Sequence, residues 1–157
     1  MENTEILIHE LKKLLNGGTA HAGLKDALND IPFDFLGKRP HGLPYSIWQL
    51  VDHIRIAQWD MVEFSKDANH ISPKWPDEYW AKKPEPKDEK EWEDCLKQID
   101  DDLKDFITLL ESEDLFTKIL HGSGQTILRE ALQIADHNAY HIAEIIVIRR
   151  LLGIWKS

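Results

Sequence analysis

Two histidines, His137 and His141, stand four positions apart in the apolar segment 128–155. Residues four apart share one face of an α-helix, so both imidazoles can reach a single metal ion. On a helical wheel the pair falls on the core-facing side, together with Ile134, Ile145 and Ile148. The chain has eight histidines, so this spacing also arises by chance. The alternative is a pair of core histidines that bond to the backbone or to each other.

A metal site needs a third ligand, and His53 is the best candidate. It lies in the helical segment that begins after Ser46, on the flank of the apolar stripe. If this segment and the one carrying the pair are neighbours, His53 faces the pair. The other histidines lie near the N-terminus or in expected loops: His9, His21, His41, His70 and His121. The alternative for His53 is a structural role, which is common for a lone histidine beside an apolar stripe.

Four helical patterns are expected to position these side chains. The second begins at Ser46, a good N-cap, the third near Asp88 and the fourth near Thr126. Gln49 follows Ser46 by three residues, which is the capping-box position. The first pattern spans about residues 2–28, and Gly17 and Gly18 predict a kink or an end within it.

The loops and the apolar periodicity define the expected fold class. Proline-rich stretches at 32–44 and 71–87 are predicted to be loops. No segment alternates with a period of two, which argues against a sheet. We expect an all-α fold, a four-helix bundle with a long connection between helices 2 and 3, as a single domain over residues 1–157. The fourth helix is apolar on nearly all sides, so it should be the most buried.

Charge and composition narrow the class of protein. The formal net charge of −9 argues against nucleic-acid binding. Residues 85–114 hold 13 acidic and 4 basic side chains, and we interpret them as the solvated side of a helix rather than a partner-binding face. No apolar run is long enough for a membrane span, and the first residues lack the features of a signal peptide. The single cysteine, Cys95, excludes an internal disulfide, and we expect a cytoplasmic protein.

Two segments resemble a known family. They read SIWQLVDHI at 46–54 and DHNAYHIAEIIVIRRLLG at 136–153. In order, spacing and helical context the chain is similar to the DinB/YfiT-like family over nearly its whole length. The resemblance implies a four-helix bundle that holds a metal ion with three histidines, which here are His53, His137 and His141. Glu144 departs from the pattern, because relatives commonly carry a glutamine there.

Three neutral imidazoles on a divalent ion leave coordination positions open for water or substrate. Zinc and nickel both accept imidazole, and iron and manganese also fit the donor type. Such an ion lowers the pKa of a bound water or thiol, or polarises an oxygen. Glu144 shares the helix face of the pair and is the predicted catalytic residue, as a fourth ligand, an acceptor for an imidazole N–H or a general base. The alternative is an ion pair with Arg149 or Arg150.

The resemblance implies a metal-dependent enzyme that acts on a small molecule, either as a hydrolase or as a thiol S-transferase that uses a low-molecular-weight thiol. The alternative is a non-catalytic stress-related or ligand-binding bundle whose metal site is structural or vacant. Family members are often dimers, so we expect a homodimer. Tryptophans that would otherwise be exposed are its interface candidates: Trp48, Trp59 and Trp155.

Three loops, 35–46, 71–87 and 115–125, are expected to form the rim of the site. Within the second of them, an aromatic group packs on the bundle or lines a pocket: Trp75, Tyr79 and Trp80. The glycine-rich HGSGQT stretch in the third lacks the lysine of a phosphate cradle and is predicted to be a helix cap or a rim turn. Cys95 follows three acidic residues, which disfavour a thiolate and make it a poor nucleophile.

Overall fold

Five α-helices make up the regular structure of residues 2–18 and 20–156, which the computed structural model describes. They are α1 (Glu2–Leu15), α2 (Leu24–Leu28), α3 (Ile47–Lys66), α4 (Glu89–Ser112) and α5 (Ile127–Leu151). Two short 3-10 turns, Phe33–Phe35 and Pro40–Gly42, occupy the loop before α3. Within these residues the only β pairing is an isolated bridge between Lys118 and Thr126. The all-α prediction is therefore confirmed.

The first predicted helix ends at its two glycines and does not merely bend. Gly17 and Gly18 have φ values of +102° and +65°, a left-handed conformation that stops a helix at low cost for glycine. The Gly18 amide donates to the Lys13 carbonyl at 2.8 Å and so satisfies one of the last carbonyls of α1. The chain resumes its helical course at α2, so α1 and α2 together take the place of the first helix.

The three long helices begin where the sequence predicts, and a side chain caps each of them. The Ser46 hydroxyl accepts from the Gln49 amide at 3.2 Å, and the Gln49 side chain returns to the Ser46 amide at 3.3 Å, which completes the capping box. Asp88 caps α4 by accepting from the Glu91 amide at 2.9 Å. Thr126 caps α5 through the Arg129 amide at 3.2 Å. The caps at Ser46 and Thr126 fix where the two helices that carry the histidines begin.

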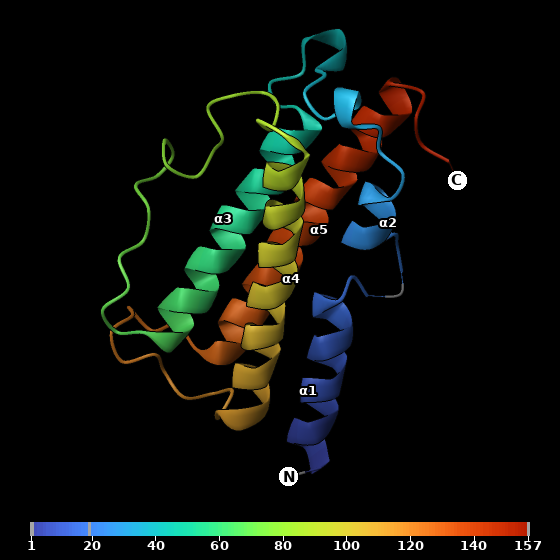
Figure 1. The fold of residues 1–157 in the computed structure, drawn as a ribbon. Helices are drawn as coiled ribbons and strands as arrows, with labels where there is room; N and C mark the ends of the chain where they lie inside the picture. The colour runs from blue at the N-terminus through green and yellow to red at the C-terminus, as the bar shows by residue number, and fades with distance from the viewer. Residues whose placement is uncertain (1, 19, 157) are drawn as a thin grey trace.

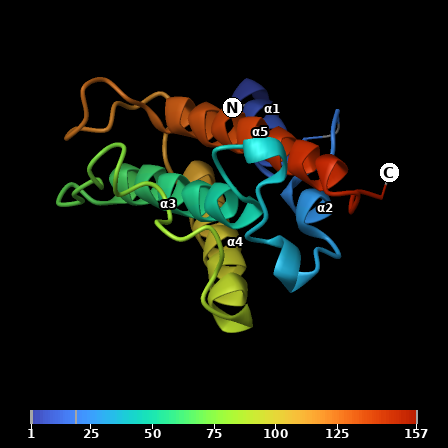
Figure 2. The same ribbon diagram turned by 90° about the horizontal axis from the view of Figure 1, so that it is seen from above.

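The long connection between α3 and α4 is a consequence of topology. α3 and α4 run in the same direction and α5 runs back antiparallel to them (Figure 1). A helix of 20 residues is about 30 Å long, so the chain must return that distance before α4 can start. Residues 67–88 make this return along the outer side of α3, as both views show (Figures 1 and 2).

Burial is greatest in α3, and the prediction that the fourth long helix would be the most buried is wrong. α3 has 11 buried residues among 20, whereas α5 has 10 among 25. The connection and two helices cover α3, while one side of α5 faces solvent (Figure 2). Large apolar side chains of α5 that are exposed include Leu132, Tyr140, Val147 and Leu151. None of the helices in the described residues combines the length and apolar character that a bilayer span requires.

The tryptophans expected at a dimer interface are not on an open surface. Trp48 is only 5% exposed and packs near Trp92, so its assignment to an interface is wrong. Helix geometry explains the error, because α3 is enclosed on most sides and no outward position is left for Trp48. Trp59 packs against His70 with ring centroids 5.1 Å apart, and Trp155 lies beside the Arg149 guanidinium. The homodimer itself remains a prediction.

The acidic run forms the solvated side of α4, as predicted. Its carboxylates make ion pairs within the same helix, among them Lys90 with Asp94 and Lys97 with Asp101. These side chains are all close to half exposed or more. Such pairs contribute little stability individually, and they need no partner protein to explain them.

Candidate metal centre

Three histidines from two helices meet in the bundle. His53 comes from the second turn of α3, and His137 and His141 come from the middle of α5. One nitrogen of each ring lies within 4.8 Å of the others. Nε2 of His53 is 3.0 Å from Nε2 of His137, and the ring centroids of His137 and His141 are 4.6 Å apart. The structure thus brings together the three histidines singled out in the sequence.

Two of the rings are oriented by acceptors on their outer nitrogens. The His53 Nδ1–H donates to the Tyr79 carbonyl at 2.9 Å, and the His141 Nδ1–H donates to the Glu144 carboxylate at 2.7 Å. An acceptor on Nδ1 fixes the tautomer, because the proton must lie there. Nε2 of each ring therefore keeps its lone pair, and this is the nitrogen left for a metal ion.

His137 is the ring without such an acceptor. Its Nδ1 is buried and has no hydrogen-bond partner. Because His53 carries its proton on Nδ1, the 3.0 Å contact between the two Nε2 atoms is a hydrogen bond from His137 to His53. A metal ion would replace this proton, and the ring would then protonate at Nδ1. The contact therefore brings together two nitrogens that a single ion could bind.

Burial keeps the imidazoles neutral. It lowers the pKa of both His137 and His141 to about 4, and the charge of neighbouring rings adds to the effect. Burial also lowers the pKa of His53, against the opposing influence of the Tyr79 carbonyl. Neutral imidazole is the form that binds metal, so near pH 7 the rings do not have to lose a charge first.

The donor set fits a divalent transition metal. The nitrogens converge, the rings are neutral, and two of the rings donate from Nδ1 to acceptors of the kind that support metal-ligating histidine. Within residues 2–18 and 20–156, this is the one group of at least three His, Cys, Asp or Glu side chains close enough to share an ion. Three imidazoles suit zinc and nickel, and they leave coordination positions for another molecule.

Aromatic side chains of the long connection form one side of the site. The Trp80 ring stacks on His53 with centroids 3.8 Å apart and planes 6° from parallel. Tyr45, from the loop before α3, stacks in turn on Trp80 at 4.0 Å. Trp75 is 69% exposed and lies further out, with its centroid 6.4 Å from that of His53. Packing of these residues is thus confirmed for Trp80. The predicted rim loop 71–87 reaches His53 directly, whereas loop 35–46 reaches it only through Trp80.

The third predicted rim loop lies elsewhere. His121 Nε2 is 2.7 Å from the carbonyl of Phe64, near the C-terminal end of α3. Phe64 is eleven residues beyond His53, which is about 16 Å along the helix. The assignment of loop 115–125 to the rim is therefore wrong, because α5 starts at the end of the bundle remote from the site. The HGSGQT stretch forms the turn before α5 and ends in its cap, Thr126.

Cys95 is a poor nucleophile for a reason that the sequence only partly indicates. The thiol is buried, and burial raises its pKa to about 12, with a further contribution from Asp52. The acidic neighbours in the chain matter less than this desolvation. No thiol nucleophile is therefore available from this residue near neutral pH.

Glu144 contacts the site through His141 and does not pair with the neighbouring arginines. Arg149 is buried and donates to backbone carbonyls, including that of Ala27 at 2.7 Å and that of Asn29 at 2.8 Å. Burial raises the pKa of Glu144, whose side chain is 40% exposed. Glu144 is therefore an acceptor for a ring N–H with one edge open to incoming molecules.

Sequence reasoning missed the acceptor that orients His53. The group is the main-chain carbonyl of Tyr79, and a backbone carbonyl leaves no trace in residue type. The sequence does show a high density of aromatic residues in the proline-bounded segment 71–87. It indicates packing, but it does not reveal which carbonyl faces the helix.

Comparison with known proteins agrees with this geometry. A family model described as the DinB superfamily matches residues 19–145. The chain belongs to the DinB superfamily. No curated protein and no solved structure matches it. In this DinB-superfamily chain the matched range includes His53, His137, His141 and Glu144.

Proposed function

We propose that this DinB-superfamily protein is a metal-dependent enzyme that acts on a small molecule at His53, His137 and His141. The observation that supports it best is the convergence of three imidazoles, those of His53 and His141 buried and that of His137 half-buried, on one point between α3 and α5. A structural zinc site is usually closed by four protein ligands, whereas three ligands are typical of a catalytic one. Zinc or nickel is the proposed ion.

In this proposal, different residues of the chain accept a proton and position the metal ligands. When bound, the ion supplies Lewis acidity and lowers the pKa of a nucleophile. Glu144 holds His141 through Oε2, and its other oxygen, Oε1, is the proposed acceptor for the proton of the nucleophile. The raised pKa of Glu144 brings it closer to the range in which a carboxylate exchanges protons near neutrality. Trp80 and Tyr79 hold His53 and exclude water from that side.

The nucleophile is water in the hydrolase form of this proposal and a low-molecular-weight thiol in the transferase form. A thiol would have to come from a second substrate, because Cys95 is buried and protonated. A hollow of about 330 Å³ beside Glu144 is a place for the apolar part of a substrate. Its lining includes Leu43, Tyr45, Tyr140 and Val147.

A non-catalytic binding or stress-related bundle is the second candidate. The hydrogen bond between His53 and His137 favours it, because it satisfies both Nε2 atoms without any ion. A protein of this kind would turn over none of the substrates tested, whether its site held a structural metal ion or stayed vacant.

Elemental analysis and a substrate screen test the proposal. The purified protein should contain about one zinc or nickel ion per chain, and chelation should abolish turnover that the added ion restores. A panel of thiols with a chromogenic electrophile tests the transferase form, and p-nitrophenyl acetate tests the hydrolase form. Absence of bound metal after incubation with either ion would refute the enzyme proposal. Metal binding without turnover in either assay would favour the binding protein.

We also propose that the protein is a cytoplasmic homodimer. The exposed apolar side chains of α5, such as Leu132 and Leu151, supply surface that a second copy could cover. Light scattering at micromolar concentration measures the mass directly. A mass of one chain at all concentrations would contradict the dimer without affecting the metal site.

A further inference from the structure

A single carboxylate of α3 binds two residues of the long connection. Asp60 Oδ1 accepts from Nε2 of His70 at 2.7 Å, and Asp60 Oδ2 accepts from the Tyr79 hydroxyl at 2.5 Å. The side chains of Asp60 and His70 are only 14% and 8% exposed, so water competes little for these bonds. Hydrogen bonds to a carboxylate are roughly twice as strong as those between neutral groups. Asp60 therefore ties both ends of segment 70–79 to the helix.

Tyr79 is also the residue that orients His53. Its carbonyl accepts from His53 Nδ1 at 2.9 Å, and the next residue, Trp80, stacks on the same ring. Asp60 lies seven positions after His53, which is close to two full turns, so the two residues share one face of α3. Tyr79 thus contacts α3 at two points that are about 10 Å apart along the helix axis, through its carbonyl and through its hydroxyl.

The turn that ends at Tyr79 is anchored on both sides. The Tyr79 amide donates to the Pro76 carbonyl at 3.1 Å, which closes the turn internally but does not join it to α3. Asp60 binds the turn on one side, and on the other side Gln49 Nε2 donates to the Ala81 carbonyl at 2.8 Å. Removal of the Asp60 anchor would therefore let the Tyr79 carbonyl shift, while Gln49 keeps the chain near the helix.

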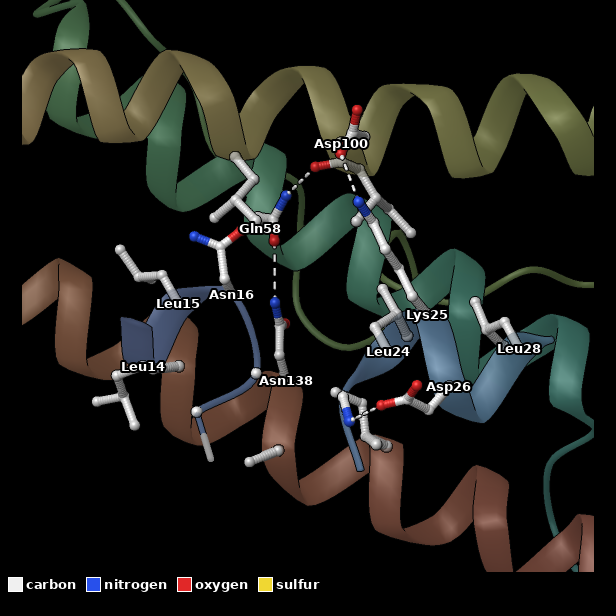
Figure 3. A pocket seen from close by; sticks show the side chains of 18 of the residues that line it. Leu14, Leu15, Asn16, Leu24, Lys25, Asp26, Leu28, Gln58, Asp100 and Asn138 are labelled. Carbon is white, nitrogen blue, oxygen red and sulfur yellow. Dashed lines mark hydrogen bonds and ion pairs between the residues drawn. The ribbon is translucent and has the colours of Figure 1, made fainter. Parts of the chain in front are cut away.

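α3 itself is fixed without help from Asp60. Gln58 lies two positions earlier, and at 100° per residue it points to the opposite side of the helix. Gln58 Nε2 donates to the Ile99 carbonyl at 2.7 Å, and Gln58 Oε1 accepts from Asn138 Nδ2 at 2.9 Å (Figure 3). These bonds join α3 to α4 and α5. Loss of the Asp60 contacts should therefore release the turn and leave the helix in place.

We propose that Asp60 is a positioning residue for His53. By binding Tyr79 and His70 it holds the Tyr79 carbonyl at Nδ1 of His53, which keeps the ring proton there and directs the Nε2 lone pair toward the other two histidines. The effect on the His53 ring exists in the metal-free protein, whereas its consequence for metal affinity rests on the proposed function.

Long-range proton–nitrogen correlation NMR of the histidine rings in metal-free protein tests this role. Wild type should show His53 mainly as the Nδ1–H tautomer, with widely separated chemical shifts for its ring nitrogens. Asp60→Ala should narrow this separation by about a fifth or more, because the Nε2–H tautomer becomes populated. Tyr79→Phe removes the hydroxyl contact from the other end and should shift the signals in the same direction. Asp60→Asn can still accept from Tyr79 and donate to His70, so it should keep the wild-type signals.

Thr126→Ala is the matched control, because it also removes a side-chain hydrogen bond but at the end of the bundle remote from the site. It should leave the His53 signals unchanged. Unchanged signals in Tyr79→Phe or in folded Asp60→Ala, or equal changes in Thr126→Ala, would overturn the role of Asp60. If Asp60→Ala lacks the helical circular dichroism of wild type, Tyr79→Phe decides.

Nickel affinity gives a second measurement, by competition with a chromophoric chelator. Asp60→Ala should bind nickel about threefold to tenfold more weakly than wild type, because it loosens the acceptor of one ligand, and Asp60→Asn should bind it as wild type does. If the wild type binds no nickel or zinc, the proposed function fails, while the ring signals of the metal-free proteins still decide the role of Asp60. Equal nickel affinity of wild type and Asp60→Ala would contradict the consequence for the metal.

Discussion

Nε2 of His53 and Nε2 of His137 lie 3.0 Å apart, although 84 positions separate the two residues in the chain. Both rings are neutral near pH 7, so one proton holds them together. Exchange of that proton for a divalent ion is the event on which the proposed function depends.

His137→Ala should lower the affinity for zinc or nickel by more than about 100-fold, because it removes one of three ligands. The exposed His9, on α1, is the matched control, and His9→Ala should leave the affinity unchanged. Titration against a competing chromophoric chelator measures both. Circular dichroism should show the wild-type helical content in each variant. Equal affinities in the two variants would rule out the metal site.

Glu144→Gln separates the two roles of the carboxylate. The glutamine oxygen still accepts from His141, so metal affinity should remain within about threefold of wild type, whereas Glu144→Ala should lower it about 10- to 100-fold. Glutamine cannot take up a proton, so turnover should fall by about 100-fold or more in both variants. Full turnover in Glu144→Gln would show that Glu144 only orients His141.

Trp80 should report on metal binding by its fluorescence. Its ring is stacked 3.8 Å from the His53 ring, so a nickel ion at the site would lie close enough to quench it. Trp80→Phe keeps an aromatic ring on His53 and should remove most of the quenching. Trp59→Phe is the control, because Trp59 packs on His70 instead. The assignment of the quenching to Trp80 would be wrong if Trp59→Phe lost the quenching by nickel and Trp80→Phe kept it.

Glu130→Gln should stabilise the protein at pH 7. Glu130 is 5% exposed, and its nearest cation is the Arg129 guanidinium at 3.5 Å. Burial raises the pKa of this carboxyl in the folded protein above its ordinary value. The wild type therefore has its full stability at low pH and loses part of it as pH rises through the raised pKa. At pH 7 the gain in the variant should be about 1 kcal/mol, or roughly 3 °C in Tm.

At pH 4 the same variant should show no gain, since the carboxyl is then protonated in the folded and the unfolded chain. Glu5→Gln changes an exposed position of α1 and should leave Tm unchanged at both pH values. Thermal melts of the three proteins at pH 4 and pH 7 make the comparison. A gain of the same size at both pH values would point to packing rather than charge.

Local signals account for what the sequence predicts well. Caps such as Ser46 and Thr126 act within one turn, and the spacing of His137 and His141 is a property of a single helix. The pairing with His53 depends on which helices are neighbours, and there the family resemblance agrees with the structure.

The wrong predictions from the sequence have a common cause: each depends on which parts of the folded chain lie next to one another. The exposure of α5 and the burial of Trp48 depend on what the long connection covers, and residue type does not encode this. The same applies to the Tyr79 carbonyl, which acts through the main chain. The assignment of loop 115–125 to the rim of the site is wrong because the amino-acid sequence of α5 does not show in which direction this helix runs in the bundle.

The separation of His53 and His137 along the chain also determines when the proposed metal ion could bind. The nitrogens meet only after α5 has docked on α3, and closing so long a loop is one of the costly steps of folding. No shorter stretch of the chain contains all three ligands, so the ion cannot nucleate folding as it does in a zinc finger. The hydrogen bond between the two rings preserves the geometry in the meantime. Loading of the proposed ion would therefore follow folding of the chain.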